Sequence, residues 1–137
     1  SEKMGKKAAS LKKEFEMFLY QLKLVVAEKK FDEFIDSLRN LSIEIRKEQG
    51  CLDFNLYMDL EKKDTYRVSG EWQTRQAMEA HFMREKFSVL VGAARVLSGD
   101  FEMRIGETLE KGNSQFAKEK ISFTNKHQTE RSDNENN

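Results

Sequence analysis

The feature that most constrains the fold is a change of hydrophobic period between Ile45 and Gly106. Two short segments there, Cys51–Leu60 and Thr65–Trp72, alternate apolar and polar residues. A period of two is typical of a β-strand with one buried face. The residues between them, 61–64, read Glu-Lys-Lys-Asp, which favours a solvated turn. The pattern therefore predicts an antiparallel hairpin whose apolar face must be covered by another layer.

Regular patterns on both sides of this hairpin predict the remaining elements. Gly50 supplies the stop of a preceding helix, and Thr74 is suited to cap a following one. The order β-α-β-β-α-β predicts an α+β, ferredoxin-like fold, with an antiparallel sheet and the helices on one face. The predicted elements outside the hairpin are a strand at Met17–Ala27, a helix at about Phe31–Gln49, helical pieces at about 74–84 and Phe87–Leu97, and a strand at Asp100–Gly106.

Each predicted strand has an apolar face, which is expected to meet the helices. Its residues are Phe18, Tyr20, Leu22, Leu24, Val26, Leu52, Phe54, Leu56, Met58, Leu60, Tyr66, Val68, Trp72, Phe101, Met103 and Ile105. An antiparallel sheet can leave its other face in water. That face can also pack against a second copy, with opposite charges paired across a two-fold axis. The sequence alone favours neither. The polar residues concerned are Gln21, Lys23, Asp53, Asn55, Tyr57, Arg67, Ser69, Glu71, Glu102 and Arg104.

Composition and length indicate one domain with polar extensions. We expect a Lys-rich extension at 1–16, a domain at 17–107 and a polar tail at 108–137, anchored by Phe116, Ile121 and Phe123 and with a disordered end. Lys plus Arg and Asp plus Glu balance at 24 each, so no field attracts nucleic acid. The single cysteine, Cys51, fits a reducing compartment. No apolar run approaches the ~20 residues of a membrane span, and a cytoplasmic location is expected.

Few residues suggest a chemistry. Trp72 is placed on the helix-facing side, where a lone Trp is usually a core residue. Tyr20 and Tyr66 share that side, and a buried hydroxyl needs a partner. His81 has two interpretations: a surface residue paired with Glu85, or a base near neutral pH.

Other residue types point away from common sites. Arg95 lies in an apolar run, where it extends to solvent or pairs with Glu71 or an anion. His81, His127 and Cys51 lack zinc-ligand spacing, and no glycine-rich phosphate loop is present. Cys51 has no recognisable basic partner, which favours a small buried side chain. No metal site is predicted.

The hairpin that ends in Glu71-Trp72, followed by a helix carrying Ala80-His81, resembles the antibiotic biosynthesis monooxygenase family. The resemblance implies a homodimer whose sheets pack into a dimeric α/β barrel, with no metal or organic cofactor. It also implies a cavity between sheet and helices that Trp72 lines. His81 stands where many members carry a histidine.

The residues around Trp72 narrow the resemblance. Polyketide-quinone-forming members carry an Asn four residues before this Trp and a Tyr six after it, where this chain has Val68 and Met78. Haem-degrading members carry a helix Trp and an iron-ligating His at the positions of His81 and Val91. The remaining resemblance is to the quinol monooxygenase-like group. We therefore expect a small aromatic quinol or phenol as substrate, with His81 as catalytic residue and Trp72, Tyr66 and Tyr20 binding the ring; the alternative is a non-catalytic binding or interaction protein on the same fold.

Overall fold

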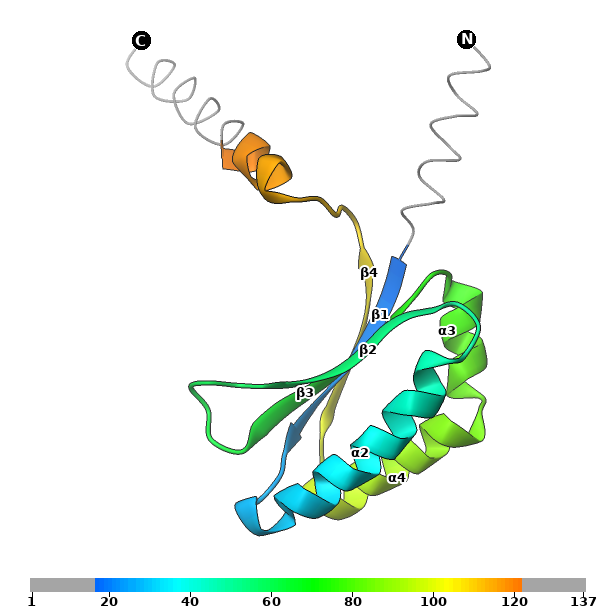
Figure 1. Ribbon diagram of the computed structural model, residues 1–137, viewed down its shortest axis with the longest axis vertical. Helices are drawn as coiled ribbons and strands as arrows, with labels where there is room; N and C mark the ends of the chain where they lie inside the picture. The colour runs from blue at the N-terminus through cyan, green and yellow to red at the C-terminus, as the bar shows by residue number, and fades with distance from the viewer. Residues whose placement is uncertain (1–16, 122–137) are drawn as a thin grey trace.

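The computed structural model describes residues 17–121, and the predicted order of strands and helices is confirmed there (Figure 1). The second predicted helix consists of two consecutive helices, and residues 114–121 form a further helix after the last strand. The elements are β1 (Met17–Val25), a 3-10 turn η1 (Glu28–Lys30), α2 (Phe31–Arg46), β2 (Cys51–Met58), β3 (Thr65–Trp72), α3 (Arg75–Phe82), α4 (Glu85–Ser98) and β4 (Glu102–Thr108).

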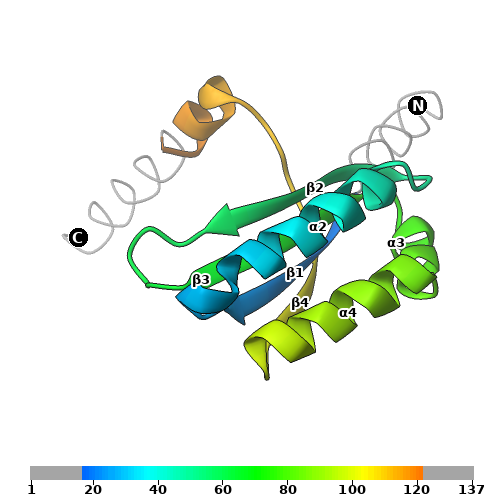
Figure 2. The same cartoon turned by 60° about the horizontal axis from the view of Figure 1, so that its bottom comes forward.

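The four strands form one antiparallel sheet in the order β2-β3-β1-β4. Helices α2 and α4 lie side by side across one face of this sheet, and α3 covers its end (Figures 1 and 2). Both crossovers therefore return on the same face, which is the ferredoxin-like arrangement. This topology makes β1 and β3 the central strands, so their helix-facing residues are the best covered.

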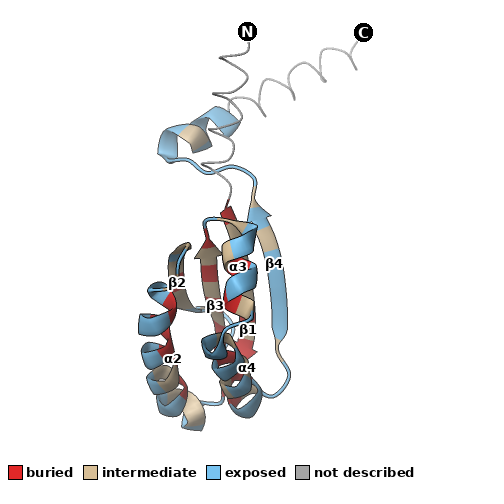
Figure 3. Ribbon diagram, turned by 90° about the vertical axis from the view of Figure 1, so that its right-hand side faces the viewer, coloured by how far each residue is buried: buried red, intermediate tan, exposed pale blue. Residues whose placement is uncertain are grey.

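The core lies between the sheet and the helices, as the alternation in the sequence predicts (Figure 3). Gly70, in the middle of β3, is needed for the packing of this core. A Cβ atom there would lie 3.1 Å from Tyr20 Cε1 and 3.2 Å from both Phe54 Cδ2 and Trp72 Nε1. The absence of a side chain allows these three rings to meet. Side chains with no exposed surface include Tyr20, Leu22, Leu24, Val26, Ile45, Val68, Trp72 and His81.

In β2, the prediction that Leu52 and Leu60 face the helices is wrong. Cys51 pairs with Trp72 and Asp53 pairs with Glu71, so Leu52 is an extra residue in a β-bulge and is 50% exposed. Leu60 follows the end of the strand and is 90% exposed. A period of two cannot show an inserted residue or a strand that ends early.

In β4, the helix-facing side is assigned correctly but its burial is not. Ile105 pairs with Tyr20 and Met103 pairs with Leu22, so both lie on the predicted face. They are nevertheless 58% and 38% exposed, because β4 is an edge strand that the helices do not cover (Figure 3). Alternation therefore predicts the side of the sheet and not the extent of the covering layer.

The ends of α2 and α3 bring two distant parts of the chain together. Helix α2 ends at Arg46, and a turn follows in which Gly50 has a φ of +82°, a backbone conformation that favours glycine. A Cβ atom on Gly50 would lie only 2.5 Å from Ala77 Cβ in α3, so the turn packs directly on that helix. Thr74 caps α3 as predicted, since its Oγ1 accepts a hydrogen bond from Ala77 N at 3.1 Å.

The face of the sheet that points away from the helices carries like charges side by side. Asp53 pairs with Glu71 at one end of the strands, and Lys23 pairs with Arg67 at the other, where its second neighbour, on β4, is the acidic Glu102. Like charges directly opposite each other on neighbouring strands are destabilising. None of these four side chains makes an ion pair with another residue in the part of the chain that the structure describes.

The extension at 1–16 and the tail end at 122–137, including Phe123, lie outside the described residues. In the described part of the tail, Asn113 Oδ1 accepts hydrogen bonds from the backbone of Gln115 and Phe116, which starts a helix. Ile121 in that helix is 61% exposed, and docking of the tail on the domain or on a second copy stays a prediction. Among residues 17–121 no helix is long and apolar enough to cross a membrane.

Candidate functional site

His81 lies at the centre of a buried cluster of rings. It comes from α3 and has no exposed surface. Its imidazole stacks on Trp72 at a centroid distance of 4.5 Å and on Tyr20 at 5.4 Å. Phe82 and Phe87 surround it from the junction of α3 and α4. The interpretation of His81 as a surface residue paired with Glu85 is therefore wrong.

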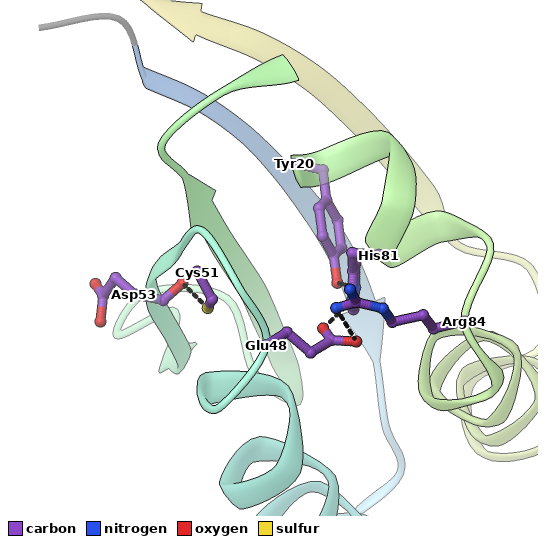
Figure 4. Close-up of polar contacts among 6 residues, drawn as sticks. All are labelled: Tyr20, Glu48, Cys51, Asp53, His81 and Arg84. Atoms are coloured by element: carbon purple, nitrogen blue, oxygen red, sulfur yellow. Dashed lines mark hydrogen bonds and ion pairs between the residues drawn. The ribbon is translucent and has the colours of Figure 1, made fainter. Parts of the chain in front are cut away.

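A chain of hydrogen bonds runs through His81 (Figure 4). The Tyr20 hydroxyl lies 2.7 Å from His81 Nε2, and His81 Nδ1 lies 2.5 Å from Glu48 Oε2. The other carboxylate oxygen, Glu48 Oε1, lies 3.3 Å from Arg84 Nη1. The side chain of Glu48 is 9% exposed and that of Arg84 is 42% exposed. This series of contacts therefore connects the buried Tyr20 hydroxyl with Arg84 at the surface.

Burial sets the charge state of both rings. It lowers the pKa of His81 below its ordinary value of 6.5, and this effect outweighs Glu48, which raises the pKa. The expectation that His81 titrates near neutral pH is therefore corrected to a lower pKa. Burial, together with Glu48 and Cys51, raises the pKa of Tyr20. At neutral pH the imidazole and the phenol are both uncharged, so His81 can accept a proton.

Two buried polar atoms beside His81 lack a hydrogen-bond partner in the described chain, Trp72 Nε1 and Glu48 Oε1. Glu48 Oε1 has the Arg84 cation within 3.3 Å, although the pair lacks hydrogen-bond geometry. The Trp72 indole N–H has no such compensation. Buried donors are usually satisfied, so Trp72 can donate to an oxygen atom of a ligand.

The structure brings together three of the four predicted site residues. Trp72, Tyr20 and His81 form one cluster, whereas Tyr66 lies six positions before Trp72 in β3, about 20 Å along the strand. Tyr66 packs against Phe31 and Phe34 and lines an open cleft near the hairpin tip. The grouping of Tyr66 with the other three residues is therefore wrong.

Glu48 was not among the candidate residues, and the predicted helix at about Phe31–Gln49 places it in the last turn. Helix α2 ends earlier, and the turn that contains Gly50 carries Glu48 toward α3. One signal was present for His81: it stands three residues after Met78, and both lie on the buried face of α3.

The other candidates stay apart from this cluster. Arg95 is exposed and lines a surface cleft with Asp100, away from Glu71. Cys51 is half-buried, its Sγ donates to the Asp53 carbonyl at 3.6 Å, and burial raises its thiol pKa to about 11. Within residues 17–121 no group of three His, Cys, Asp or Glu side chains is arranged to hold a metal ion.

The fold and the buried cluster define a small ferredoxin-like domain with a histidine enclosed between sheet and helices. The sequence matches the model of the antibiotic biosynthesis monooxygenase family over residues 17–92, more than half of its 137 residues. The chain belongs to the antibiotic biosynthesis monooxygenase family. A comparison with curated proteins found no matching relative.

Solved structures share this fold. A conserved protein from Methanosarcina mazei Go1 is 22% identical, with a TM-score of 0.62 and coverage of 72% of this chain and 97% of that one. A structure named antibiotic biosynthesis monooxygenase is 19% identical, with a TM-score of 0.58 and coverage of 69% and 99%. The protein Rv0793 from Mycobacterium tuberculosis is 12% identical, with a TM-score of 0.63 and coverage of 71% and 99%. At these identities the comparison establishes the fold and not the reaction.

Proposed function

We propose that this protein is a cofactor-independent monooxygenase that oxidises a small aromatic quinol or phenol bound between the sheet and the helices. The observation that carries the proposal is the fully buried His81, stacked on Trp72 and hydrogen-bonded to both Tyr20 and Glu48. His81 supplies a proton acceptor, and Trp72 supplies an aromatic surface and a hydrogen-bond donor, at one site from which water is excluded. Membership of the monooxygenase family supports the reaction class.

The reaction needs little from the protein beyond removal of a proton and exclusion of water. One phenol and one dioxygen give one quinone and one water. The substrate loses its hydroxyl proton and one ring hydrogen, which leave in the water together with one oxygen atom. The other oxygen atom becomes the new carbonyl. The phenolate supplies the electrons, so its formation is the step that a base accelerates.

The residues of the cluster suggest an order of proton transfer. A substrate hydroxyl gives its proton to the Tyr20 oxygen while Tyr20 gives its own proton to His81 Nε2, 2.7 Å away. The resulting imidazolium is stabilised by Glu48, whose carboxylate is 2.5 Å from Nδ1. The Trp72 N–H donates to a substrate oxygen, and its ring offers a flat surface to the substrate.

Complete burial of the cluster favours the alternative, a non-catalytic small-molecule-binding or interaction protein on the same fold, in which these rings stabilise the core. Tyr20, Trp72 and His81 have no exposed surface, so a substrate reaches them only after side chains move. The ion pair between Glu48 and Arg84 lies at the end of the cluster that solvent reaches. A non-catalytic protein would bind a small molecule or a partner without taking up oxygen.

We also propose that the chain acts as a homodimer through the polar face of its sheet. The acidic pair Asp53–Glu71 and the basic pair Lys23–Arg67 lie about 13 Å apart along β3. A two-fold axis that crosses the strands between them would place each acidic pair opposite the basic pair of the second copy. The unfavourable like-charge pairs of one chain would then be neutralised.

Oxygen uptake with a panel of quinols and phenols tests the function. We expect turnover with at least one flat substrate. We also expect His81→Gln to reduce kcat by about 10²- to 10⁴-fold, as the loss of a general base does. Trp72→Phe keeps a ring but removes the N–H, so it should raise KM more than it lowers kcat. The matched control is His127→Ala, which changes the only other histidine and should leave the rate unchanged.

Two results would contradict the proposal. The absence of oxygen uptake and of binding across the panel would favour the non-catalytic alternative. Full turnover in His81→Gln, with an unchanged pH profile, would assign deprotonation to the substrate itself or to bulk water.

A further inference from the structure

Glu48 is held in place by the turn that joins α2 to β2. Its backbone N–H donates to the Ile45 carbonyl at 3.0 Å, and its own carbonyl accepts from Cys51 N at 3.1 Å. Gly50 in the same turn packs against Ala77 of α3, the helix that carries His81. The contact of Gly50 with α3 holds the turn that carries Glu48 close to the helix that carries His81.

The two oxygen atoms of the carboxylate have different neighbours (Figure 4). Oε2 lies 2.5 Å from His81 Nδ1, and Oε1 lies 3.3 Å from Arg84 Nη1. A carboxylate accepts hydrogen bonds and donates none, so the hydrogen bond between Oε2 and the imidazole is donated by the ring N–H. The proton of the neutral imidazole therefore lies on Nδ1. This leaves the lone pair of Nε2 facing the Tyr20 hydroxyl, which donates to it.

We propose that Glu48 is a positioning residue, whose carboxylate fixes His81 as the Nδ1–H tautomer and so directs the basic nitrogen, Nε2, toward Tyr20. The role in turnover rests on the proposed function, whereas the tautomer itself is a property of the resting protein. Which ring nitrogen of a histidine is basic is commonly determined by the hydrogen bond at the other nitrogen. Glu48 is the group that makes this bond, and it does not touch the substrate.

The same contacts give Glu48 and Arg84 different roles at the imidazole. Arg84 approaches the carboxylate and not the imidazole, so it acts on the charge of the site and not on the tautomer. Glu48 raises the pKa of His81 and Arg84 lowers it. Removing the carboxylate should therefore lower the pKa of His81 and release the tautomer. Removing the guanidinium should raise the pKa and leave the tautomer unchanged.

Nitrogen-15 NMR of the imidazole tests this directly. The chain has two histidines, so a His127→Asn background leaves the signals of His81 alone. In this background we expect the Nδ1–H pattern at neutral pH. In Glu48→Gln, whose amide can either donate or accept, we expect the shifts of the two nitrogens to move toward each other. Glu48→Asp retains a carboxylate and should restore the Nδ1–H pattern at least in part.

The control variants are Glu44→Gln and Arg84→Gln. Glu44 is exposed and pairs with Lys47 on the surface of α2, so its loss should change neither nitrogen shift. Arg84→Gln should retain the Nδ1–H pattern. An Nε2–H pattern in the otherwise unchanged protein would overturn the proposal before any Glu48 variant is made. So would an unchanged pattern and an unchanged His81 pKa in folded Glu48→Gln.

Kinetics then distinguish this proposal from the proposed function. With a substrate that turns over, Glu48→Gln should reduce kcat by about 10²-fold or more and change KM little, because the basic nitrogen is no longer directed at Tyr20. If no quinol reacts, the proposed function fails, while the NMR result still decides the role of Glu48. If a quinol reacts and Glu48→Gln retains full kcat, the positioning role is rejected and the proposed function stands.

Discussion

Replacing Tyr20 with Phe removes one hydroxyl from the centre of the core, and the cost can be worked out from the contacts. The hydroxyl lies 2.7 Å from His81 Nε2, and in the proposed Nδ1–H tautomer it donates to this nitrogen; both side chains have no exposed surface. Without it, Nε2 is a buried acceptor with no partner, which costs about 1–3 kcal/mol of unfolding free energy. The ring stays in place, so no cavity beyond one oxygen atom is created.

Tyr66→Phe is the matched control. Tyr66 also points toward the helices, from the neighbouring strand β3, and is 7% exposed. Its hydroxyl makes no hydrogen bond to another residue within 17–121. Its loss should therefore change the unfolding free energy by less than about 0.5 kcal/mol.

Urea unfolding at one fixed protein concentration gives both free energies, and the fixed concentration keeps any contribution from association the same for the two variants. We expect Tyr20→Phe to be less stable than Tyr66→Phe by about 1–3 kcal/mol with an unchanged m-value. Equal stability of the two variants would refute the reasoning. It would mean that the Tyr20–His81 contact contributes nothing beyond ring packing.

Further predictions follow from other contacts. His81 has a folded-state pKa below 6.5, so the unfolded chain binds more protons as the pH falls below 6.5. Stability should then fall by up to about 1.4 kcal/mol per pH unit until the folded pKa is reached. Urea unfolding from pH 7 to pH 5 should show this slope, and in His81→Gln the slope should be reduced. Gly70→Ala should lose about 1–3 kcal/mol because its Cβ meets three rings, whereas Gly92→Ala, with nothing within 4 Å, should gain stability. In thermal unfolding, similar behaviour of these two variants would contradict the packing described for Gly70. Light scattering at micromolar concentration should give about 32 kDa, twice the 16.1 kDa of the chain, and a monomer would leave the polar face of the sheet in water.

The sequence predicted the fold closely because the fold depends on local periods. The alternation in β1 and β3 placed Tyr20 and Trp72 on the helix-facing side, and Thr65–Trp72 has the predicted bounds. Errors arose where burial depends on something other than the local period, such as a bulge or the extent of the helix layer. Leu52 is displaced by a bulge, and Ile105 is exposed because the helices do not extend to the edge strand.

The candidate site could be predicted only in part, because it depends on contacts between distant residues. Alternation identified the faces of Trp72 and Tyr20, but not that His81 lies between their rings. Glu48 and His81 are 33 positions apart, and no local period relates them. Tyr66 was grouped with Trp72 because both share a face, although distance along the strand separates them.

The proposed function depends most directly on the binding of an aromatic substrate at Trp72 and His81. Trp72 is the only tryptophan of the chain, so its indole N–H gives a single side-chain signal in a proton–nitrogen NMR spectrum. Titration with a quinol that supports oxygen uptake should shift this signal downfield as the N–H gains an acceptor. The midpoint of the titration should fall at a free quinol concentration equal to Kd. A signal that stays unchanged at saturating quinol, while turnover continues, would place the substrate elsewhere and contradict the account.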